Sequence, residues 1–179
     1  WELYQQNEHH ILNLSIAIFP AIYIALPFSL LNGLGHIMAD SQLTWLLPLA
    51  FFMFIWTNDV GAYCVGCTIG KHRLFERISP KKSWEGSVGG AIFTIIAAIV
   101  IWKIHPIFNI WVWIGMAIIT VVFGTFGDLA ESLIKRELGV KDSGKILPGH
   151  GGFLDRFDST LLAAPIVYTY IYYVSSSAL

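Results

Sequence analysis

Apolar residues in this chain are gathered into five long stretches, which short polar segments separate. A helix needs roughly 20 mostly apolar residues to cross the hydrocarbon core of a bilayer, and each stretch reaches or approaches that length. The pattern therefore predicts an all-α fold, a polytopic membrane bundle with about five transmembrane helices. The fourth helix can continue past its apolar stretch to Leu138. The stretches are about 11–31, 43–69, 88–104, 110–126 and 159–174.

Some positions in these stretches are unusual for a helix in water but suit a membrane. Pro20 and Pro27 lie inside the first stretch. Proline kinks a helix, yet neighbouring helices in a bundle tolerate it. The last stretch ends in tyrosines, which favour the headgroup interface, at Tyr168, Tyr170, Tyr172 and Tyr173.

The composition agrees with a membrane location. Of the 179 residues, 55% are hydrophobic and 13% are charged, whereas a soluble domain carries about 25% charged residues. The mean hydropathy is +0.63. Such a chain has too little polar surface to cover a water-soluble globule, so we expect the lipid bilayer to be its solvent. The net charge of −1 says nothing by itself about partners, and we expect no nucleic-acid partner.

Basic residues alternate between the connections. Segment 32–42 has none, 70–87 has five, the turn after the third stretch has one, and 128–158 has five. By the positive-inside rule, both basic connections face the cytoplasm. We therefore predict a multi-pass protein of the cell or inner membrane whose polar site faces the cytoplasm.

The whole chain, 1–179, is predicted to be one membrane-embedded domain. It begins at Trp1, and no positively charged segment precedes the first apolar stretch, so we expect no signal peptide. We expect the chain to be the C-terminal part of a longer protein. Cys64 and Cys67 have the spacing C-x-x-C, but no second Cys/His pair follows at zinc spacing, so we expect small packing residues.

A polar stripe follows the fourth stretch. Asp128, Glu131, Ser132 and Lys135 recur at i, i+3, i+4 and i+7, which places them on one face of a helix. The stripe begins where the apolar run ends, so its acids are expected at or just under the membrane surface. Acids at that depth are costly unless they are paired, hydrated or bound to a cation.

A glycine-rich turn comes next, Pro148-Gly149-His150-Gly151-Gly152. This composition excludes a regular helix interior, and successive backbone N–H groups in such a turn can hold phosphate. Asp155 and Asp158 follow three residues apart, on one face of a helix whose N-terminus points at the turn. Arg156 lies between them.

Two upstream features belong with this turn. The segment 79–86 reads Ser-Pro-Lys-Lys-Ser-Trp-Glu-Gly and could hold a triphosphate and stack on a base. Its alternative is a solvated loop with a tryptophan anchor at the interface. Asn58 and Asp59 interrupt an apolar run and are functional candidates, with a structural hydrogen bond between helices as the alternative. We favour function, because Asp59 falls near the basic connection.

Together these groups indicate metal-assisted phosphate chemistry. Carboxylate oxygens suit Mg²⁺, which takes one or two carboxylates plus substrate phosphates. Lysine and arginine neutralise phosphate charge. Displacement at phosphorus needs mainly positioning and charge stabilisation, so a Ser-His-Asp or Cys-His arrangement is not required.

The segment 132–158 resembles the signature of the CDP-diacylglycerol synthases, or phosphatidate cytidylyltransferases. Asn58-Asp59 with Ala62-Tyr63, and the segment 79–86, also look like this family. The resemblance covers about 55–158 well and the flanking helices only generally. The matching positions are Ser132, Lys135-Arg136, Lys141-Asp142, Gly144, Pro148, His150-Gly151-Gly152 and Asp155-Arg156-Phe157-Asp158.

The resemblance implies a reaction in phospholipid biosynthesis, in which CTP and phosphatidic acid give CDP-diacylglycerol and pyrophosphate. It also implies Mg²⁺, often a monovalent cation such as K⁺, and a homodimer in the membrane. Members of the family usually have more spanning helices than five.

The residue roles follow from this resemblance and the motifs. The expected metal ligands are Asp128, Asp155, Glu131 and Asp158. The expected catalytic residues are Asp128, Asp155, Lys135, Arg136 and Asp158. The expected substrate- and nucleotide-binding residues are Asn58, Asp59, Ser79, Lys81, Lys82, Ser83, Ser132, Lys141, Asp142, His150, Gly151, Gly152 and Arg156.

Three alternatives remain open. A CTP-dependent polyprenol or lipid kinase would transfer phosphate without releasing pyrophosphate. A transporter or channel also places carboxylates in the membrane, but there they line a path across it, whereas here the polar residues gather on one side. A non-catalytic scaffold would leave the glycine-rich turn and its aspartates without a purpose.

Overall fold

The computed structural model describes residues 9–38, 43–140, 143–144 and 152–177. Helices dominate, which confirms the all-α prediction, and a short antiparallel hairpin is the addition that the sequence analysis did not foresee. The elements are α1 (His10–Pro20), the π-helical turn η2 (Ala21–Ala25), α2 (Leu26–His36), α3 (Leu46–Ile69), β1 (Arg73–Phe75), β2 (Ser79–Ser83), α4 (Trp84–Ile104), α5 (Ile110–Glu137) and α6 (Leu154–Ser177).

Within the described part of the chain, four helices are long and apolar enough to span a bilayer: α1 to α2 as one helix (His10–His36), α3, α4 and α5. The protein is therefore an integral multi-pass membrane protein. The fifth expected span corresponds to α6, which is long enough but is diluted by polar residues at both ends. It is nevertheless an inner helix of the bundle, because Val167 and Ile171 are buried in the common core.

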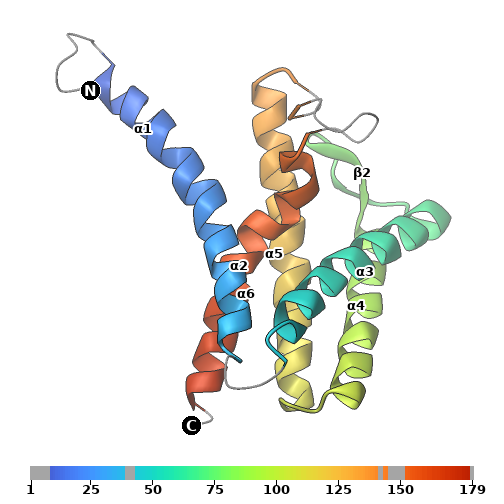
Figure 1. The fold of residues 1–179 in the computed structure, drawn as a ribbon. Coiled ribbons are helices and arrows are strands. Elements are labelled where there is room, and N and C mark those ends of the chain that lie inside the picture. The colour runs from blue at the N-terminus through green and yellow to red at the C-terminus, as the bar shows by residue number, and fades with distance from the viewer. Residues whose placement is uncertain (1–8, 39–42, 141–142, 145–151, 178–179) are drawn as a thin grey trace.

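The core lies between α2, α3, α4, α5 and α6. Its largest fully buried side chains include Phe51 and Phe54 of α3 and Trp113 and Met116 of α5. None of the residues of α1, all of which the structure describes, is buried. Figure 1 shows α1 diverging from the other helices.

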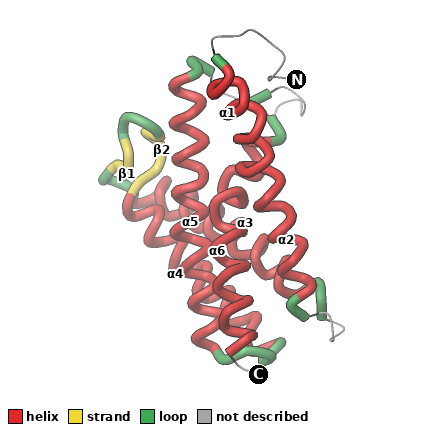
Figure 2. The backbone as a smooth tube through the Cα atoms, turned by 90° about the vertical axis from the view of Figure 1, so that its left-hand side faces the viewer, coloured by secondary structure: helices red, strands yellow, loops and turns green. Residues whose placement is uncertain are grey.

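The polar elements share one end of the bundle. The hairpin, the C-terminal end of α5 and the start of α6 lie toward the upper end in Figure 1, whereas the α4–α5 connection and the C-terminus lie at the lower end. In both Figure 1 and Figure 2, α5 and α6 lie between the hairpin on one side and α2 on the other. This arrangement matches the charge alternation along the sequence.

Capping residues and a glycine determine where α4 begins and α5 ends at the polar end of the bundle. Ser83 is the N-cap of α4, and its Oγ accepts a hydrogen bond from the Gly86 backbone N–H at 3.1 Å. The last turn of α5 closes when the Val140 N–H donates to the Lys135 carbonyl at 3.0 Å. Gly139 makes this possible with a φ of +67°, a backbone conformation that glycine adopts without strain. The expectation that this helix continues beyond its apolar stretch is confirmed.

Glycines let α3 and α4 approach closely behind the hairpin. A Cβ added at Gly90 would lie 2.5 Å from Asn58 Oδ1 and 2.7 Å from the Asn58 carbonyl oxygen. A Cβ added at Gly86 would lie 2.8 Å from the Ala62 carbonyl oxygen. Small residues at such crossings are typical of membrane helices, because packing and not hydrophobicity drives their association. The close crossing positions Asn58 and Asp59 beside the start of α4.

We predict that Gly90→Ala lowers the free energy of unfolding by about 1–3 kcal/mol, the usual cost of forcing an extra group into a packed core. Thermal unfolding in detergent would measure the change. Gly124→Ala is the matched control, because its Cβ would meet Ser159 Cβ at an ordinary 3.5 Å. The control should be neutral or stabilising, since alanine favours a helix interior by about 1 kcal/mol over glycine. Equal unfolding temperatures for both variants would contradict the close crossing.

Candidate functional site

Opposite charges from β2, α5 and α6 meet at the polar end of the bundle. Lys82 on β2 forms an ion pair with Asp128 on α5, through its Nζ and the carboxylate Oδ2. The other oxygen of Asp128 accepts a hydrogen bond from Ser132 Oγ at 3.2 Å. This contact joins two segments that are more than 40 residues apart in the sequence, and both were predicted to bind substrate or metal.

A second cluster lies one turn further along α5. Lys135 Nζ lies 2.8 Å from Glu131 Oε2 and 2.6 Å from Asp155 Oδ1 on α6. The Glu131 side chain is only 1% exposed. Its second oxygen, Oε1, is buried and has no hydrogen-bond partner within the described part of the chain. A buried carboxylate oxygen without a partner is costly, so it marks a place where a ligand or cation could bind.

Asp155 accepts hydrogen bonds from two residues that precede α6, Ser143 and Gly152. Its Oδ2 accepts hydrogen bonds from Ser143 N and Ser143 Oγ, both at 2.8 Å, and from Gly152 N at 2.7 Å. Partial burial raises the pKa of this carboxyl, but the Lys135 ammonium and these donors outweigh burial and hold the pKa well below its usual range. Asp155 is therefore ionised and holds residues 143 and 152 against the end of α5.

The two upstream candidates meet at a cavity of about 210 Å³. Asn58 and Asp59 come to it from α3, and Lys81, Lys82 and Ser83 come from the hairpin. Asn58 Oδ1 is buried and has no partner among the described residues. Two lysines and the hydroxyls around one cavity are donors that suit a polyanionic ligand, whereas the Asn58 Oδ1 acceptor needs a donor or a cation. The full lining is Asn58, Asp59, Ala62, Tyr63, Lys81, Lys82, Ser83, Gly86, Ser87 and Thr125.

Glu85 is a site residue that the sequence analysis missed. Its carboxylate accepts hydrogen bonds from the backbone N–H groups of Lys71 and His72 at 3.2 Å, and it lies 2.6 Å from His72 Nδ1. The Trp84 N–H also donates to the His72 carbonyl at 3.0 Å. Glu85 therefore closes the base of the hairpin that carries Lys82. Its position two residues after the N-cap serine, in the first turn of α4, was the signal that could have indicated a structural carboxylate.

We predict that Glu85→Ala loosens the hairpin, because two backbone donors at its base lose their acceptor. Limited trypsin digestion should cut the Lys71–Lys82 segment several-fold faster, since cleavage follows local opening. Glu76→Ala is the control, as this exposed carboxylate lies in the same hairpin. Unchanged cleavage of the Glu85 variant would show that other contacts hold the hairpin.

The remaining predicted residues have different surroundings. Arg136 and Arg156 are exposed at the same end of the molecule, and Ser79 pairs with Phe75 in the hairpin register. Asp158 is half-buried, and its Oδ1 accepts a hydrogen bond from the Ser159 N–H at 2.5 Å. Four predicted binding residues lie outside the described residues: Lys141, Asp142, His150 and Gly151.

The carboxylates of Asp128, Glu131, Asp155 and Asp158 supply the hard oxygen ligands that Mg²⁺ prefers. Within the described ranges, no group of three or more His, Cys, Asp or Glu side chains is already arranged around a common centre. Lysines lie against Asp128, Glu131 and Asp155 instead. Mg²⁺ needs only one or two carboxylates when substrate phosphates supply further oxygens, and Glu131 Oε1 is a hard oxygen without a partner. The assignment of Asp128, Asp155, Glu131 and Asp158 as ligands stays a prediction.

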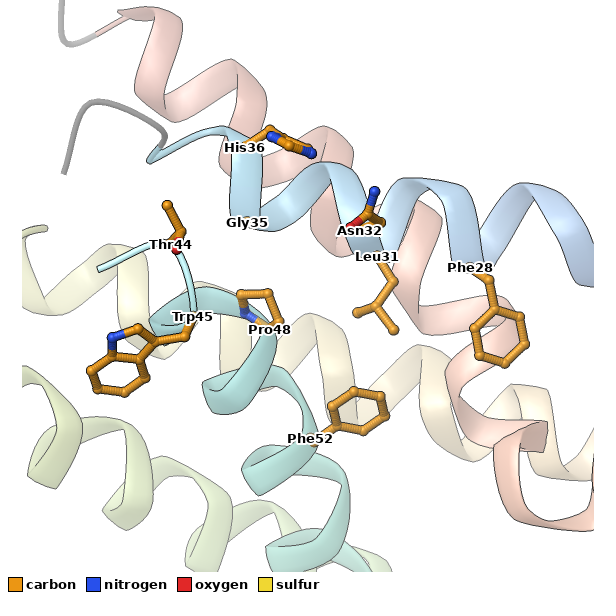
Figure 3. Close-up of a pocket in the computed structure, with 9 residues that line it drawn as sticks. All are labelled: Phe28, Leu31, Asn32, Gly35, His36, Thr44, Trp45, Pro48 and Phe52. Atoms are coloured by element: carbon orange, nitrogen blue, oxygen red, sulfur yellow. The ribbon is translucent and has the colours of Figure 1, made fainter. Parts of the chain in front are cut away.

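A larger cavity, of about 490 Å³, lies between α2 and α3. Figure 3 shows Phe28, Leu31 and Phe52 pointing into the space between the two helices. The lining holds no acid, lysine or arginine, and Phe28, Leu31 and Phe52 give it an apolar wall that suits a hydrocarbon chain better than a phosphate. Its polar members are Asn32, His36 and Thr44. Its lining residues are Phe28, Leu31, Asn32, Gly35, His36, Thr44, Trp45, Pro48 and Phe52.

Comparisons with known proteins agree on one family. The sequence model described as the cytidylyltransferase family matches residues 1–174. Proteins named phosphatidate cytidylyltransferase are similar to the chain in Staphylococcus haemolyticus (49% identity over 117 residues), Staphylococcus saprophyticus (50% over 119) and Staphylococcus aureus strain COL (45% over 117). Each alignment covers 65% of this chain and 45% of the relative. The chain thus spans about half the length of the curated relatives it matches.

Proposed function

The chain belongs to the cytidylyltransferase family, and on this premise we propose that it transfers a cytidylyl group from CTP to phosphatidic acid, giving CDP-diacylglycerol and pyrophosphate. The observation that carries the proposal is the ion pair between Lys82 and Asp128. It joins the lysine-bearing hairpin, which we propose to bind phosphate, to the carboxylates of α5 at one end of a membrane bundle. The relatives named for this activity support the choice of lipid and nucleotide.

The cavity beside the hairpin is the proposed nucleotide site. Lys81 and Lys82 neutralise the triphosphate, and Ser83 and Asn58 supply hydrogen bonds. When the triphosphate binds, Lys82 exchanges the Asp128 carboxylate for a phosphate oxygen. Asp128 is thereby released to act on the reacting centre, which couples nucleotide binding to assembly of the site.

In the proposed reaction, an oxygen of the phosphatidate phosphate attacks the α-phosphorus of CTP. A new phosphorus–oxygen bond forms, the bond between the α-phosphorus and the α,β-bridging oxygen breaks, and pyrophosphate leaves with the bonding electrons. The phosphatidate phosphate is ionised at neutral pH, so no strong general base is needed. Lys135, Arg136 and Arg156 are the proposed cations that neutralise substrate phosphates on the α5–α6 side.

Mg²⁺ is the proposed cofactor, held by Asp128 and Asp155 with Glu131 and Asp158 as further ligands. When bound, it would neutralise charge on the phosphate oxygens during displacement. K⁺ is a second proposed cation. The active site is proposed to face the cytoplasm, where CTP is made, because ten of the eleven basic residues lie in the sequence segments 70–87 and 128–158. A homodimer in the bilayer is the proposed assembly.

The direct test is an assay of the full-length protein in detergent micelles with phosphatidate, Mg²⁺ and CTP labelled at the α- or the γ-phosphate. We expect α-label in the lipid product and γ-label in pyrophosphate, with EDTA abolishing both. A γ-labelled lipid without pyrophosphate release would establish the lipid-kinase alternative. Absence of any lipid product would overturn the proposed function.

Asp128→Asn should lower kcat by about 100-fold or more, the scale on which preorganised charge stabilisation contributes to catalysis. The fold should survive, because the amide keeps the size of the side chain and an acceptor for Ser132 Oγ. Glu137→Gln is the matched control, since it removes an exposed carboxylate from the same helix. Near-normal turnover by the Asp128 variant would refute its role.

A further inference from the structure

Tyr23 is a polar residue that neither the motifs nor the proposed mechanism uses. It lies in the π-helical turn η2, three residues after Pro20, in the middle of the first membrane helix. Its ring stacks on Phe19 with centroids 5.1 Å apart. Single π-helical turns in membrane and soluble helices often occur at functional sites, because they redirect side chains that a regular helix would place elsewhere.

The hydroxyl of Tyr23 is buried without a hydrogen-bond partner. Among the described residues, four buried side-chain polar atoms share this condition: Tyr23 Oη, Asn58 Oδ1, Trp113 Nε1 and Glu131 Oε1. Two of the other three, those of Asn58 and Glu131, belong to the candidate site. A buried hydroxyl without a partner is costly, so a partner is expected when the site is filled.

The first membrane helix packs against the start of α6, which brings Tyr23 to the carboxylates. Phe28, five residues after Tyr23, contacts Phe157 with ring centroids 5.3 Å apart and Phe153 at 6.4 Å. Phe157 directly precedes Asp158. The Tyr23 phenol lies within electrostatic range of both Glu131 and Asp158. It is a neutral donor in the same electrostatic field as two groups that, when ionised, can only accept hydrogen bonds.

The position of Tyr23 indicates which substrate it would meet. The α5–α6 pair separates its helix from the nucleotide-type cavity at the hairpin (Figures 1 and 2). The same helix turns large apolar side chains outward, with Phe19 55% and Ile22 60% exposed, as expected for a helix in contact with lipid. The cavity between α2 and α3 begins at Phe28, and its apolar wall of Phe28, Leu31 and Phe52 offers space for an acyl chain (Figure 3).

We propose that the Tyr23 hydroxyl binds the headgroup phosphate of the lipid substrate by donating a hydrogen bond to it, on the side of the carboxylates opposite the nucleotide. The inference rests on the proposed function for the identity of the lipid. It assigns a lipid-binding residue to the first membrane helix, outside every motif in the polar connections. The two substrates then approach the carboxylates from opposite sides, the nucleotide past the hairpin and the lipid past Tyr23.

The test is Tyr23→Phe in the full-length protein, which removes the hydroxyl and keeps the ring that stacks on Phe19. We expect the KM for dioctanoyl phosphatidate to rise about tenfold, the effect of losing one hydrogen bond to a charged group, while the KM for CTP stays within about twofold. A merely structural role would change both KM values or the unfolding temperature. Tyr172→Phe is the control, because this exposed tyrosine stacks on Tyr168 and lies near the other end of α6.

Equilibrium binding of dioctanoyl phosphatidate, measured by calorimetry, separates this inference from the reaction. Wild-type protein that binds phosphatidate without making a product would sink the proposed function, and weaker binding by the Tyr23 variant would still support the inference. Equal phosphatidate binding by Tyr23→Phe and wild type would overturn it. Wild-type protein that binds no phosphatidate would overturn both.

Discussion

The ammonium of Lys135, shared between Glu131 on α5 and Asp155 on α6, is the contact on which the polar end of the molecule depends. A carboxylate at this depth in a membrane bundle is tolerated only when a cation or a set of donors compensates it. Asp155 meets that requirement with Lys135 on one oxygen and with Ser143 and Gly152 on the other. The same carboxylate therefore links the start of α6 to α5 and to residues 143 and 152.

The close crossing of α3 and α4 at Gly86 and Gly90 positions the other half of the site, the cavity beside the hairpin. By letting the two backbones approach, Gly86 and Gly90 bring Asn58 and Asp59 level with the hairpin that Glu85 closes. Lys82 then reaches across to Asp128. Lys82 and Lys135 both neutralise carboxylates in this arrangement. Substrate phosphates and a cation would therefore replace protein ion pairs and would not have to create a charged site in an apolar medium.

Helical periodicity explains what could be predicted from the sequence. The stripe from Asp128 to Lys135 lies on one face of α5 because spacing of three and four residues is a local property. The partners of that stripe are long-range, so the contact of Lys82 with Asp128 could not be read from spacing. The hairpin was missed because β2 is five residues long and contains Pro80 and two lysines. Tyr23 was missed because one tyrosine in an apolar run resembles any other.

The central claim is that the nucleotide binds where the hairpin, α3 and α5 meet. A structure of the full-length protein with a CTP analogue that cannot react is the most direct measurement. The account predicts triphosphate density in the cavity lined by Asn58, Lys81 and Ser83, with Lys82 Nζ on a phosphate oxygen and no longer on Asp128. Density for the nucleotide elsewhere, such as the cavity between α2 and α3, with the Lys82–Asp128 pair intact, would contradict it.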